Sequence, residues 1–344
     1  MSIETVPIPA ADRTTLFPPN RVHKFFTLAD EAPFDFSASQ FSWINAWWLA
    51  ESALLSYDDP EHVQSWFERA GFALHGVQPL HGNGSTQCYV AVNNDAVIVA
   101  FRGTEVLLRS SSRGFAGKGI DVVRDLVVNA EIGVHVLAEN CWAHSGFVRG
   151  LEEVLETQLL PFLDRYAIGR TVWLTGHSLG GALATMAAYR LPRIAGIYTF
   201  GAPRVGNAGF AQALNGPLWR FCNELDIVPT IPPAQPDPRM RWIPAGYVHC
   251  GEPVHFEGDM ANFHARADEE PPALLNEVVS AVSEPMTTWD RFRAAFEEDG
   301  AATFVSLSPT TAQWQSVKQG FVNHAPLFYA LKVRNALART SSGG

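Results

Sequence analysis

The sequence is poor in cysteine and in long apolar runs. Its 344 residues include four cysteines, Cys88, Cys141, Cys222 and Cys250, and none forms a Cys-x-x-Cys pair. A zinc site or a thioredoxin-like motif is therefore not expected. Reduced cysteines are the default interpretation, with a Cys222–Cys250 bridge as the alternative. No stretch reaches about 18 uncharged apolar residues, so no transmembrane segment is expected.

Positive charge is also scarce. The sequence has 25 Lys and Arg against 35 Asp and Glu, a net charge of −10. Because nucleic acids and anionic membranes attract basic proteins, this balance argues against either as a standing partner. Residues 1–20 have no basic segment followed by an apolar run, so they are not predicted to be a Sec signal peptide. The expected location is cytoplasmic, or secreted without such a signal.

Apolar side chains, by contrast, are plentiful. They make up 47% of the sequence, with ten Trp and 22 Phe, enough for a sizeable core. The aromatic residues fit either a large packed core or a protein that handles apolar ligands.

Buried strands alternate with amphipathic helices along the chain. Apolar runs such as 96–101 are typical of strands covered on both faces. The alternation predicts an α/β fold with a mostly parallel sheet in one domain, residues 1–344. Strands are expected at 72–80, 86–92, 96–102, 171–175, 195–203 and within 218–233, antiparallel edge strands at 240–250 and 252–256, and helices at 41–57, from Pro60, and at 147–166, 179–190, 272–283 and 310–338. Residues 1–38 are interpreted as an arm laid over the domain, 105–120 as a mobile loop and 259–308 as an insertion.

The stretch "TVWLTGHSLGGA" at residues 171–182 joins a predicted strand to a predicted helix. Gly176, Ser178 and Gly180 form a Gly-x-Ser-x-Gly pattern. In such a turn the serine backbone is strained and the hydroxyl projects at the carboxyl edge of the sheet. Ser178 is therefore predicted to be a nucleophile, against the alternative of a structural serine in a tight turn.

A nucleophilic serine that attacks a carbonyl needs N–H donors for the developing oxyanion. The backbone of Leu179, the residue after Ser178, can supply one. "AFRGTE" at 100–105 leaves an earlier strand, and Thr104 can offer its backbone N–H and its hydroxyl. The alternative is an ordinary turn in which Gly103 supplies conformational freedom.

The acid is expected after a later strand. Asp226 follows the strand that begins near residue 218, with Glu224 as its nearest rival and Asp237 and Asp259 less well placed. A turn-capping aspartate is the alternative interpretation of Asp226.

The base is expected to be a histidine beyond Asp226. His249 and His255 lie within alternating strand patterns, and His264 lies in the insertion. His324 lies on a loop that enters the last helix, where Asn323 could cap it, so His324 is the predicted base. The sequence has no His-Glu-x-x-His motif, phosphate-binding loop or dinucleotide fingerprint, so neither a metal nor an organic cofactor is expected.

Nine segments in order resemble those of the class 3 lipases, the fungal-type triacylglycerol lipases of the α/β-hydrolase fold. They are "NAWWLAESALLSY", "VAFRGT", "DVVRDL", "AHSGF", "TGHSLGGALA", "FGAPRVGN", "NELDIVPTIPP", "YVHCGEPVHF" and "NHAPLFY". The resemblance implies a catalytic triad of Ser178, Asp226 and His324 with Thr104 as the first oxyanion residue, and argues against His249. It implies an acylglycerol or similar lipid ester as substrate and no cofactor.

Two segments depart from the family pattern. The loop between Thr104 and Asp125 is longer and richer in glycine than the usual lid helix, and the segment before His324 is enlarged. Within 105–120, Leu107, Leu108 and Phe115 stand beside cationic residues and could form a lid that contacts a lipid interface transiently; a solvated loop is the alternative. Alternative functions are a soluble short-chain carboxylesterase or polyester hydrolase, an acyltransferase, and a non-catalytic lipase-like interaction module.

Overall fold

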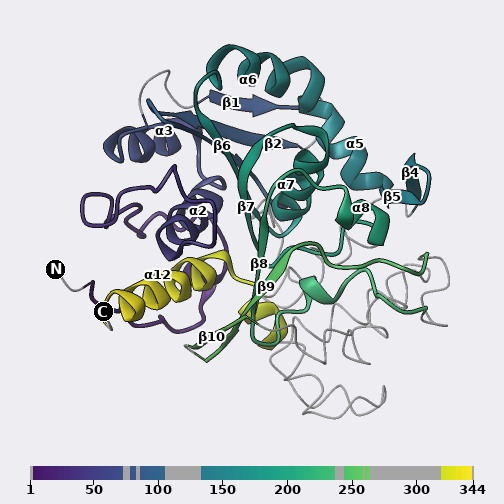
Figure 1. Ribbon diagram of the computed structural model, residues 1–344. Helices are drawn as coiled ribbons and strands as arrows, with labels where there is room; N and C mark the ends of the chain where they lie inside the picture. The colour runs from purple at the N-terminus through teal and green to yellow at the C-terminus, as the bar shows by residue number, and fades with distance from the viewer. Residues whose placement is uncertain are drawn as a thin grey trace, which may run out of the picture.

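An eight-stranded sheet forms the centre of the molecule, with helices on both faces (Figure 1). The computed structural model describes residues 3–72, 78–82, 86–104, 133–236, 244–258, 260–263 and 319–342. The sheet strands, in spatial order, are β1 (Gln78–His81), β2 (Gln87–Val92), β3 (Ala96–Phe101), β6 (Thr171–His177), β7 (Ile194–Phe200), β8 (Leu218–Asn223), β9 (Glu252–Glu257) and β10 (Met260–Asn262). A separate hairpin consists of β4 (Val134–Ala138) and β5 (Cys141–His144).

The five strands from β3 to β9 run parallel, and β1, β2 and β10 are antiparallel additions at the two edges. The predicted mostly parallel sheet is confirmed. The register places Phe101 of β3 opposite Gly176 of β6, and His177 opposite Phe200 of β7. Segments that leave these strands therefore emerge side by side at one edge of the sheet.

Helices cover the two faces of the sheet. The described helical segments are α1 (Arg13–Leu16), α2 (Trp43–Leu55), α3 (Pro60–Arg69), α5 (Ser145–Val154), the π-helical η2 (Leu155–Leu159), α6 (Leu160–Tyr166), α7 (Leu179–Arg190), α8 (Ala208–Gln212), the 3₁₀ turn η3 (Val228–Thr230) and α12 (Pro326–Ser342). α7 is confirmed at its predicted start and end. Pro60 begins α3 as predicted, capped by the side chain of Asp59.

Alternate residues of each central strand serve two different cores. Along β6, Val172 and Leu174 pack with α5 and α7, whereas Trp173 packs with α2 and α12 on the other face. Both faces are apolar because a parallel sheet is buried on both sides. Many of the buried aromatic residues, among them Trp47 and Trp48, lie in the core on the face covered by α2 and α12.

Two strand predictions were wrong. Residues 244–250 form no strand apart from an isolated bridge at Val248, because Pro244 and Gly246, which has a positive φ of 94°, break the extended pattern. The segment 252–256 is β9, which is parallel to β8 and is not an edge strand, because β10 pairs along its other side. Its alternation of polar and apolar residues had suggested an edge.

The last helix is interrupted. Residues 319–323 are helical, the chain turns at His324 and Ala325, and α12 then begins at Pro326. The predicted continuous helix over 310–338 is therefore corrected, since proline has no N–H to continue a preceding helix. Residues 310–318, the loop 105–120 with Leu107, Leu108 and Phe115, the helix 272–283 and most of the insertion 259–308 lie outside the described residues.

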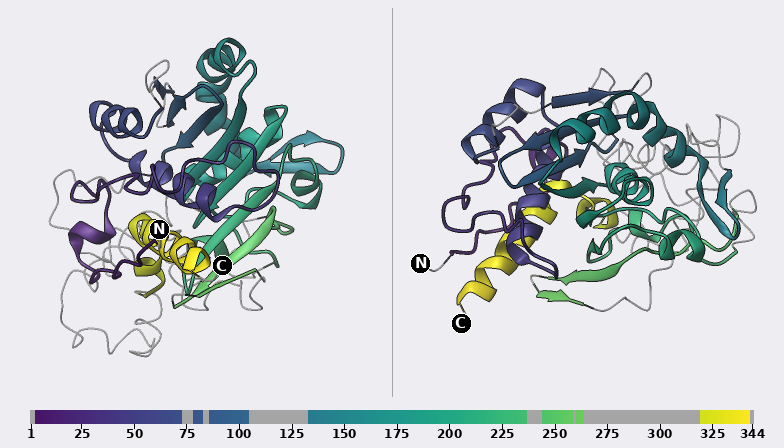
Figure 2. Two further views of the ribbon diagram at one scale, coloured as in Figure 1. Left: turned by 60° about the vertical axis from the view of Figure 1, so that its left-hand side comes forward. Right: turned by 45° about the horizontal axis from the view of Figure 1, so that its top comes forward.

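The segment predicted to be an arm is described from residue 3 onward, and several of its apolar side chains pack in the core around α2 and α12. It runs beside α2 and α12, and the two ends of the chain lie near each other (Figure 2). All four cysteines are free and buried, so the Cys222–Cys250 alternative is not realised. Within the described ranges, no helix is long and apolar enough to span a bilayer.

His144 ends β5 and caps the start of α5 in a buried position. Its Nδ1 accepts the backbone N–H of Gly146 at 3.1 Å. Burial, with a smaller contribution from the charge of Arg149, lowers the pKa of His144 to about 4. Protonation therefore favours the unfolded chain, where the pKa is that of an ordinary histidine.

We expect His144 to make the protein less stable in acid. The neutral ring of His144 contributes fully to the free energy of unfolding above pH 6.5. As the pH falls toward 4, the free energy of unfolding decreases by about 3 kcal/mol because the unfolded chain binds the proton more readily. A His144→Asn variant keeps a capping acceptor but does not titrate. Urea unfolding between pH 4 and 7 should show a pH slope smaller by about one proton in this variant. Identical slopes would contradict the assignment.

Candidate active site

Ser178 lies between β6 and α7 in a strained conformation. Its φ is 57° and its ψ is −127°, a region that non-glycine residues rarely adopt. The turn is possible because Gly176 and Gly180 have no side chains. A Cβ on Gly176 would overlap the backbone of Gly180, and a Cβ on Gly180 would overlap the carbonyl of Phe101. The strain predicted for the Gly-x-Ser-x-Gly turn is confirmed.

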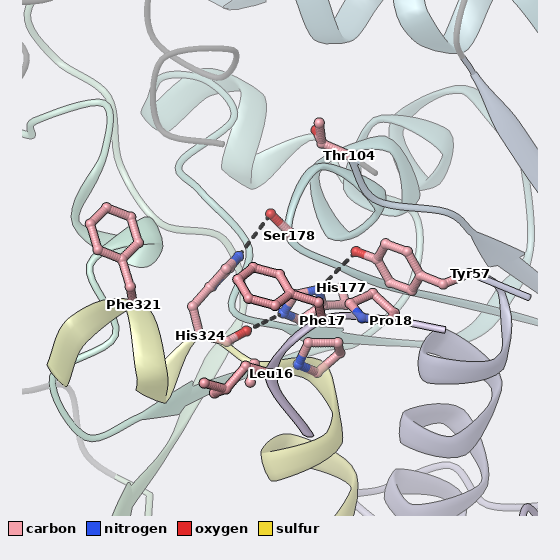
Figure 3. A pocket seen from close by; sticks show the side chains of 11 residues that line it. Leu16, Phe17, Pro18, Tyr57, Thr104, His177, Ser178, Phe321 and His324 are labelled. Carbon is pink, nitrogen blue, oxygen red and sulfur yellow. Dashed lines mark hydrogen bonds between the residues drawn. The ribbon is translucent and has the colours of Figure 1, made fainter. Parts of the chain in front are cut away.

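His324 lies at the interruption before α12 and faces Ser178. Its Nε2 is 3.0 Å from Ser178 Oγ, and Figure 3 shows the ring directed at that oxygen. Both side chains are buried. The other ring nitrogen, Nδ1, donates to Asp226, so Nε2 can accept the serine proton.

Asp226 lies just beyond β8 and holds the ring of His324. Its two oxygens are 3.0 and 2.9 Å from His324 Nδ1. Val228 donates its N–H to Oδ1 at 2.9 Å, and Tyr329 of α12 donates its hydroxyl to Oδ2 at 2.6 Å. Burial and the Asp226 charge raise the pKa of Tyr329 well above its ordinary value, so it remains a donor. The buried carboxylate therefore accepts hydrogen bonds on both oxygens, as a buried charged group requires.

The backbone of Gly201 lies directly against this pair. A Cβ there would be 2.8 Å from Asp226 Oδ2 and 3.0 Å from His324 Nδ1. Gly201 also has a positive φ of 58°, so a side chain would be disfavoured on both grounds. The glycine after β7 therefore makes room for the ring of His324.

The rival acids and bases are placed elsewhere. Glu224 forms an ion pair with Lys332 and does not contact His324. His249 is half-buried and bonded to the Pro229 carbonyl, and desolvation, with nearby arginine charges, holds its pKa well below the ordinary value. His255 is buried within β9. Asp237, Asp259 and His264 lie outside the described residues.

Thr104 and Leu179 flank Ser178. Thr104 follows β3 and shares a pocket with Ser178 and His324, and in Figure 3 Ser178 Oγ lies between Thr104 and His324. Leu179 is the first residue of α7. The N–H groups of the first helical turn have no partner within their helix and carry its positive dipole end. The sheet register thus brings both predicted oxyanion residues to the serine.

A second chain of hydrogen bonds runs behind the serine. His177 Nε2 donates to the carbonyl of His324 at 2.7 Å, and Tyr57 donates its hydroxyl to His177 Nδ1 at 2.9 Å. The Tyr57 oxygen in turn accepts the backbone N–H of Gly103. Burial, then the nearby His324, lowers the pKa of His177 well below its ordinary value, so the ring stays neutral. Segments beside Thr104, Ser178 and His324 are thereby tied together.

Sequence reasoning missed these supporting residues. Tyr57, His177, Gly201 and Tyr329 have no local pattern of their own, because their partners lie far along the chain. Only the position of His177 beside the nucleophile could have drawn attention to it. The pocket above Ser178 is lined by Leu16, Phe17, Pro18, Tyr57, Thr104, His177, Ser178, Phe321, His324, Ala325 and Pro326. The first three come from the arm, for which no such position was expected.

Part of the chain is similar in sequence to known lipases. Residues 98–235 match the sequence model of the family "Lipase (class 3)". A "Secreted mono- and diacylglycerol lipase 1" from Fusarium solani is 36% identical over 146 residues, covering 40% of this chain and 41% of that protein. A lipase of Rhizomucor miehei is 37% identical over 122 residues, 32% of this chain and 31% of that protein. The chain thus spans less than half the length of these relatives.

Among solved structures, the lipase from Rhizopus microsporus var. chinensis is 22% identical, with a TM-score of 0.42. The alignment covers 74% of this chain and 81% of that chain.

The parallel sheet, with Ser178 at a strand-to-helix turn and Asp226 and His324 following in order, defines an α/β-hydrolase fold. Within that class, residues 98–235 are similar to the class 3 lipase family.

The Tyr57–His177 connection predicts a measurable effect on Ser178. A Tyr57→Phe variant leaves His177 Nδ1 and the Gly103 N–H without the hydroxyl, so the three tied segments can shift. We expect covalent labelling of Ser178 by an organophosphonate ester to slow by about 10²-fold, as for a misplacement of about 1 Å. Tyr166→Phe, outside the pocket, should label at the wild-type rate. A wild-type rate for Tyr57→Phe would refute the positioning role.

Proposed function

We propose that the protein is a serine hydrolase that cleaves carboxylic esters of lipids, of the triacylglycerol or partial acylglycerol lipase type. The observation that carries the proposal is the chain of contacts from Ser178 Oγ to His324 Nε2 and from His324 Nδ1 to Asp226. A serine hydroxyl is a poor nucleophile unless a base takes its proton, and this arrangement supplies the base and the group that orients it.

The proposed reaction proceeds in two stages. His324 takes the proton of Ser178 as Oγ attacks the ester carbonyl, and the tetrahedral oxyanion is held by Thr104 and the Leu179 N–H. His324 then gives the proton to the leaving alcohol, which leaves an acyl-enzyme. Water attacks the acyl group with His324 again as base, and the acid product departs.

Asp226 stabilises the charged ring that forms in each stage. Its own charge is supported by the donors Val228 and Tyr329, so it can accept from His324 Nδ1 throughout. The amino end of α7 points its positive end toward the site, which favours the oxyanion. No step needs a metal or an organic cofactor.

The names of two relatives support a lipid substrate. One is called a mono- and diacylglycerol lipase and the other a lipase, and the pocket includes the apolar side chains Leu16, Phe17 and Phe321. A soluble short-chain esterase or polyester hydrolase remains the alternative. Rates across acyl lengths, above and below substrate solubility, separate the two, and product analysis with added alcohol tests for acyl transfer. A non-catalytic module would not require all three triad side chains.

His324→Ala should abolish most turnover. We expect kcat for ester hydrolysis to fall on the order of 10⁴-fold or more, as in other serine triads. His249→Ala is the matched control, because it removes another histidine ring that lies outside the pocket, and the kcat of this variant should change far less. Mass spectrometry should also find an organophosphonate ester on Ser178. Equal labelling of a Ser178→Ala variant would overturn the mechanism.

We also propose that residues 105–120 act as a lid that meets a lipid interface. The support is sequence alone: Leu107, Leu108 and Phe115 stand beside Arg109, Arg113 and Lys118, a combination suited to a lipid surface.

Deletion of residues 107–117 tests this lid. It should lower hydrolysis of emulsified esters relative to soluble esters, because the contact with the interface is lost. Unchanged activity on both substrates would rule the lid out.

A further inference from the structure

The N-terminal arm forms part of the pocket above Ser178. Leu16, Phe17 and Pro18 line it together with His324 and Tyr57, and Figure 3 shows the three arm residues beside His324 and His177. These residues are more than 150 positions away from Ser178 in the sequence. The arm therefore contributes the surface that a substrate meets next to the reacting atoms.

The local structure of the arm is fixed by its own hydrogen bonds. Asp12 accepts the backbone N–H groups of Thr14 and Thr15 at 2.8 and 3.1 Å, and the hydroxyl of Thr15 accepts the N–H of Asp12 at 2.9 Å. This capping box starts the short helix α1, which ends at Leu16. Asn20 donates its amide to the Thr14 carbonyl at 2.7 Å and closes the loop behind residues 16–18.

Apolar packing fixes the arm to the segment that carries His324. Leu16 is buried in a small cluster with Ala325 and Phe328, against which Ile8 and Phe17 pack. Ala325 directly follows His324, so the arm contacts the part of the chain that positions the base. Because burial of an apolar side chain is favourable, the packing of Leu16 favours a docked arm.

Polar anchors lie on both sides of residues 16–18. Upstream, Val6 donates its N–H to Asn335 Oδ1 at 2.7 Å and accepts from Asn335 Nδ2 at 2.8 Å. Downstream, the buried Glu51 of α2 is 3.0 Å from His23 Nε2 and accepts the N–H of Phe26 at 3.2 Å. Hydrogen bonds thus anchor the chain on both sides of residues 16–18, which form one wall of the pocket above Ser178.

We infer that Leu16 and Phe17 are specificity-determining residues that limit the size of the alkyl group beside the scissile ester. The inference rests on the proposed ester hydrolysis. The pocket measures about 50 Å³, whereas pockets for drug-sized ligands reach about 300–1,000 Å³. Because Leu16 and Phe17 form one wall, shortening either side chain extends the space along the substrate. The arm thereby favours small groups over bulky ones at this position.

The test measures kcat/KM for two ester series. The first keeps p-nitrophenol as the leaving group and lengthens the acyl chain from acetyl to dodecanoyl; the second keeps the acetyl group and enlarges the alcohol. Leu16→Ala and Phe17→Ala should each raise the ratio of kcat/KM for large substrates to kcat/KM for small substrates about tenfold or more in at least one series. A single methylene group in an apolar pocket changes kcat/KM by at least about that factor. Phe17 is half-buried, so its variant should fold even if Leu16→Ala does not.

Ile8→Ala is the matched control. Ile8 packs against the same cluster but does not line the pocket, so its substrate ratios should equal those of the wild type. Unchanged ratios in Leu16→Ala and Phe17→Ala would overturn the inference. So would an equal rise for every substrate, which would mean that the arm only obstructs the site. If wild-type Ser178 neither hydrolyses these esters nor takes up a phosphonate, the proposed function itself fails.

Discussion

The strained backbone at Ser178 is the constraint on which the site depends. A positive φ at a serine persists only where the surrounding structure holds it, and here β6, β3 and α7 approach so closely that Gly176 and Gly180 have no room for a side chain. The parallel register of the sheet then decides where everything else arrives. Thr104 leaves the neighbouring strand β3, and Asp226 follows β8 at the same edge.

Much of the fold was predictable, because its main signals are local. The apolar run of β3, the start and end of α7 and the proline at the start of α3 follow from periodicity and capping within a few residues. The parallel alignment of β9 was not predictable in this way. Its alternating pattern suits an exposed edge, and only the later strand β10, which pairs along its outer side, makes it an interior strand.

In the candidate site, too, residues with a local sequence signal were predictable and residues with distant partners were not. Gly-x-Ser-x-Gly and the order of the acid and histidine pointed to Ser178, Asp226 and His324, whose side chains the fold brings into contact. Tyr57 and Tyr329 could not be found, since a buried tyrosine has no sequence mark that tells a packing role from a hydrogen-bonding one. Residues 1–38 were interpreted as an arm, but the contact of this segment with the pocket depends on α12, more than 300 residues away.

The contact of Leu16 with Ala325 and Phe328 has a consequence for the order in which the molecule is completed. During synthesis the arm is made before its docking surface, which follows more than 300 residues later in the sequence. Contacts between residues so distant in sequence form late, after the intervening chain has closed the loop between them. The pocket over Ser178 therefore gains its outer wall only after Ala325 and Phe328 have been made and have packed against Leu16.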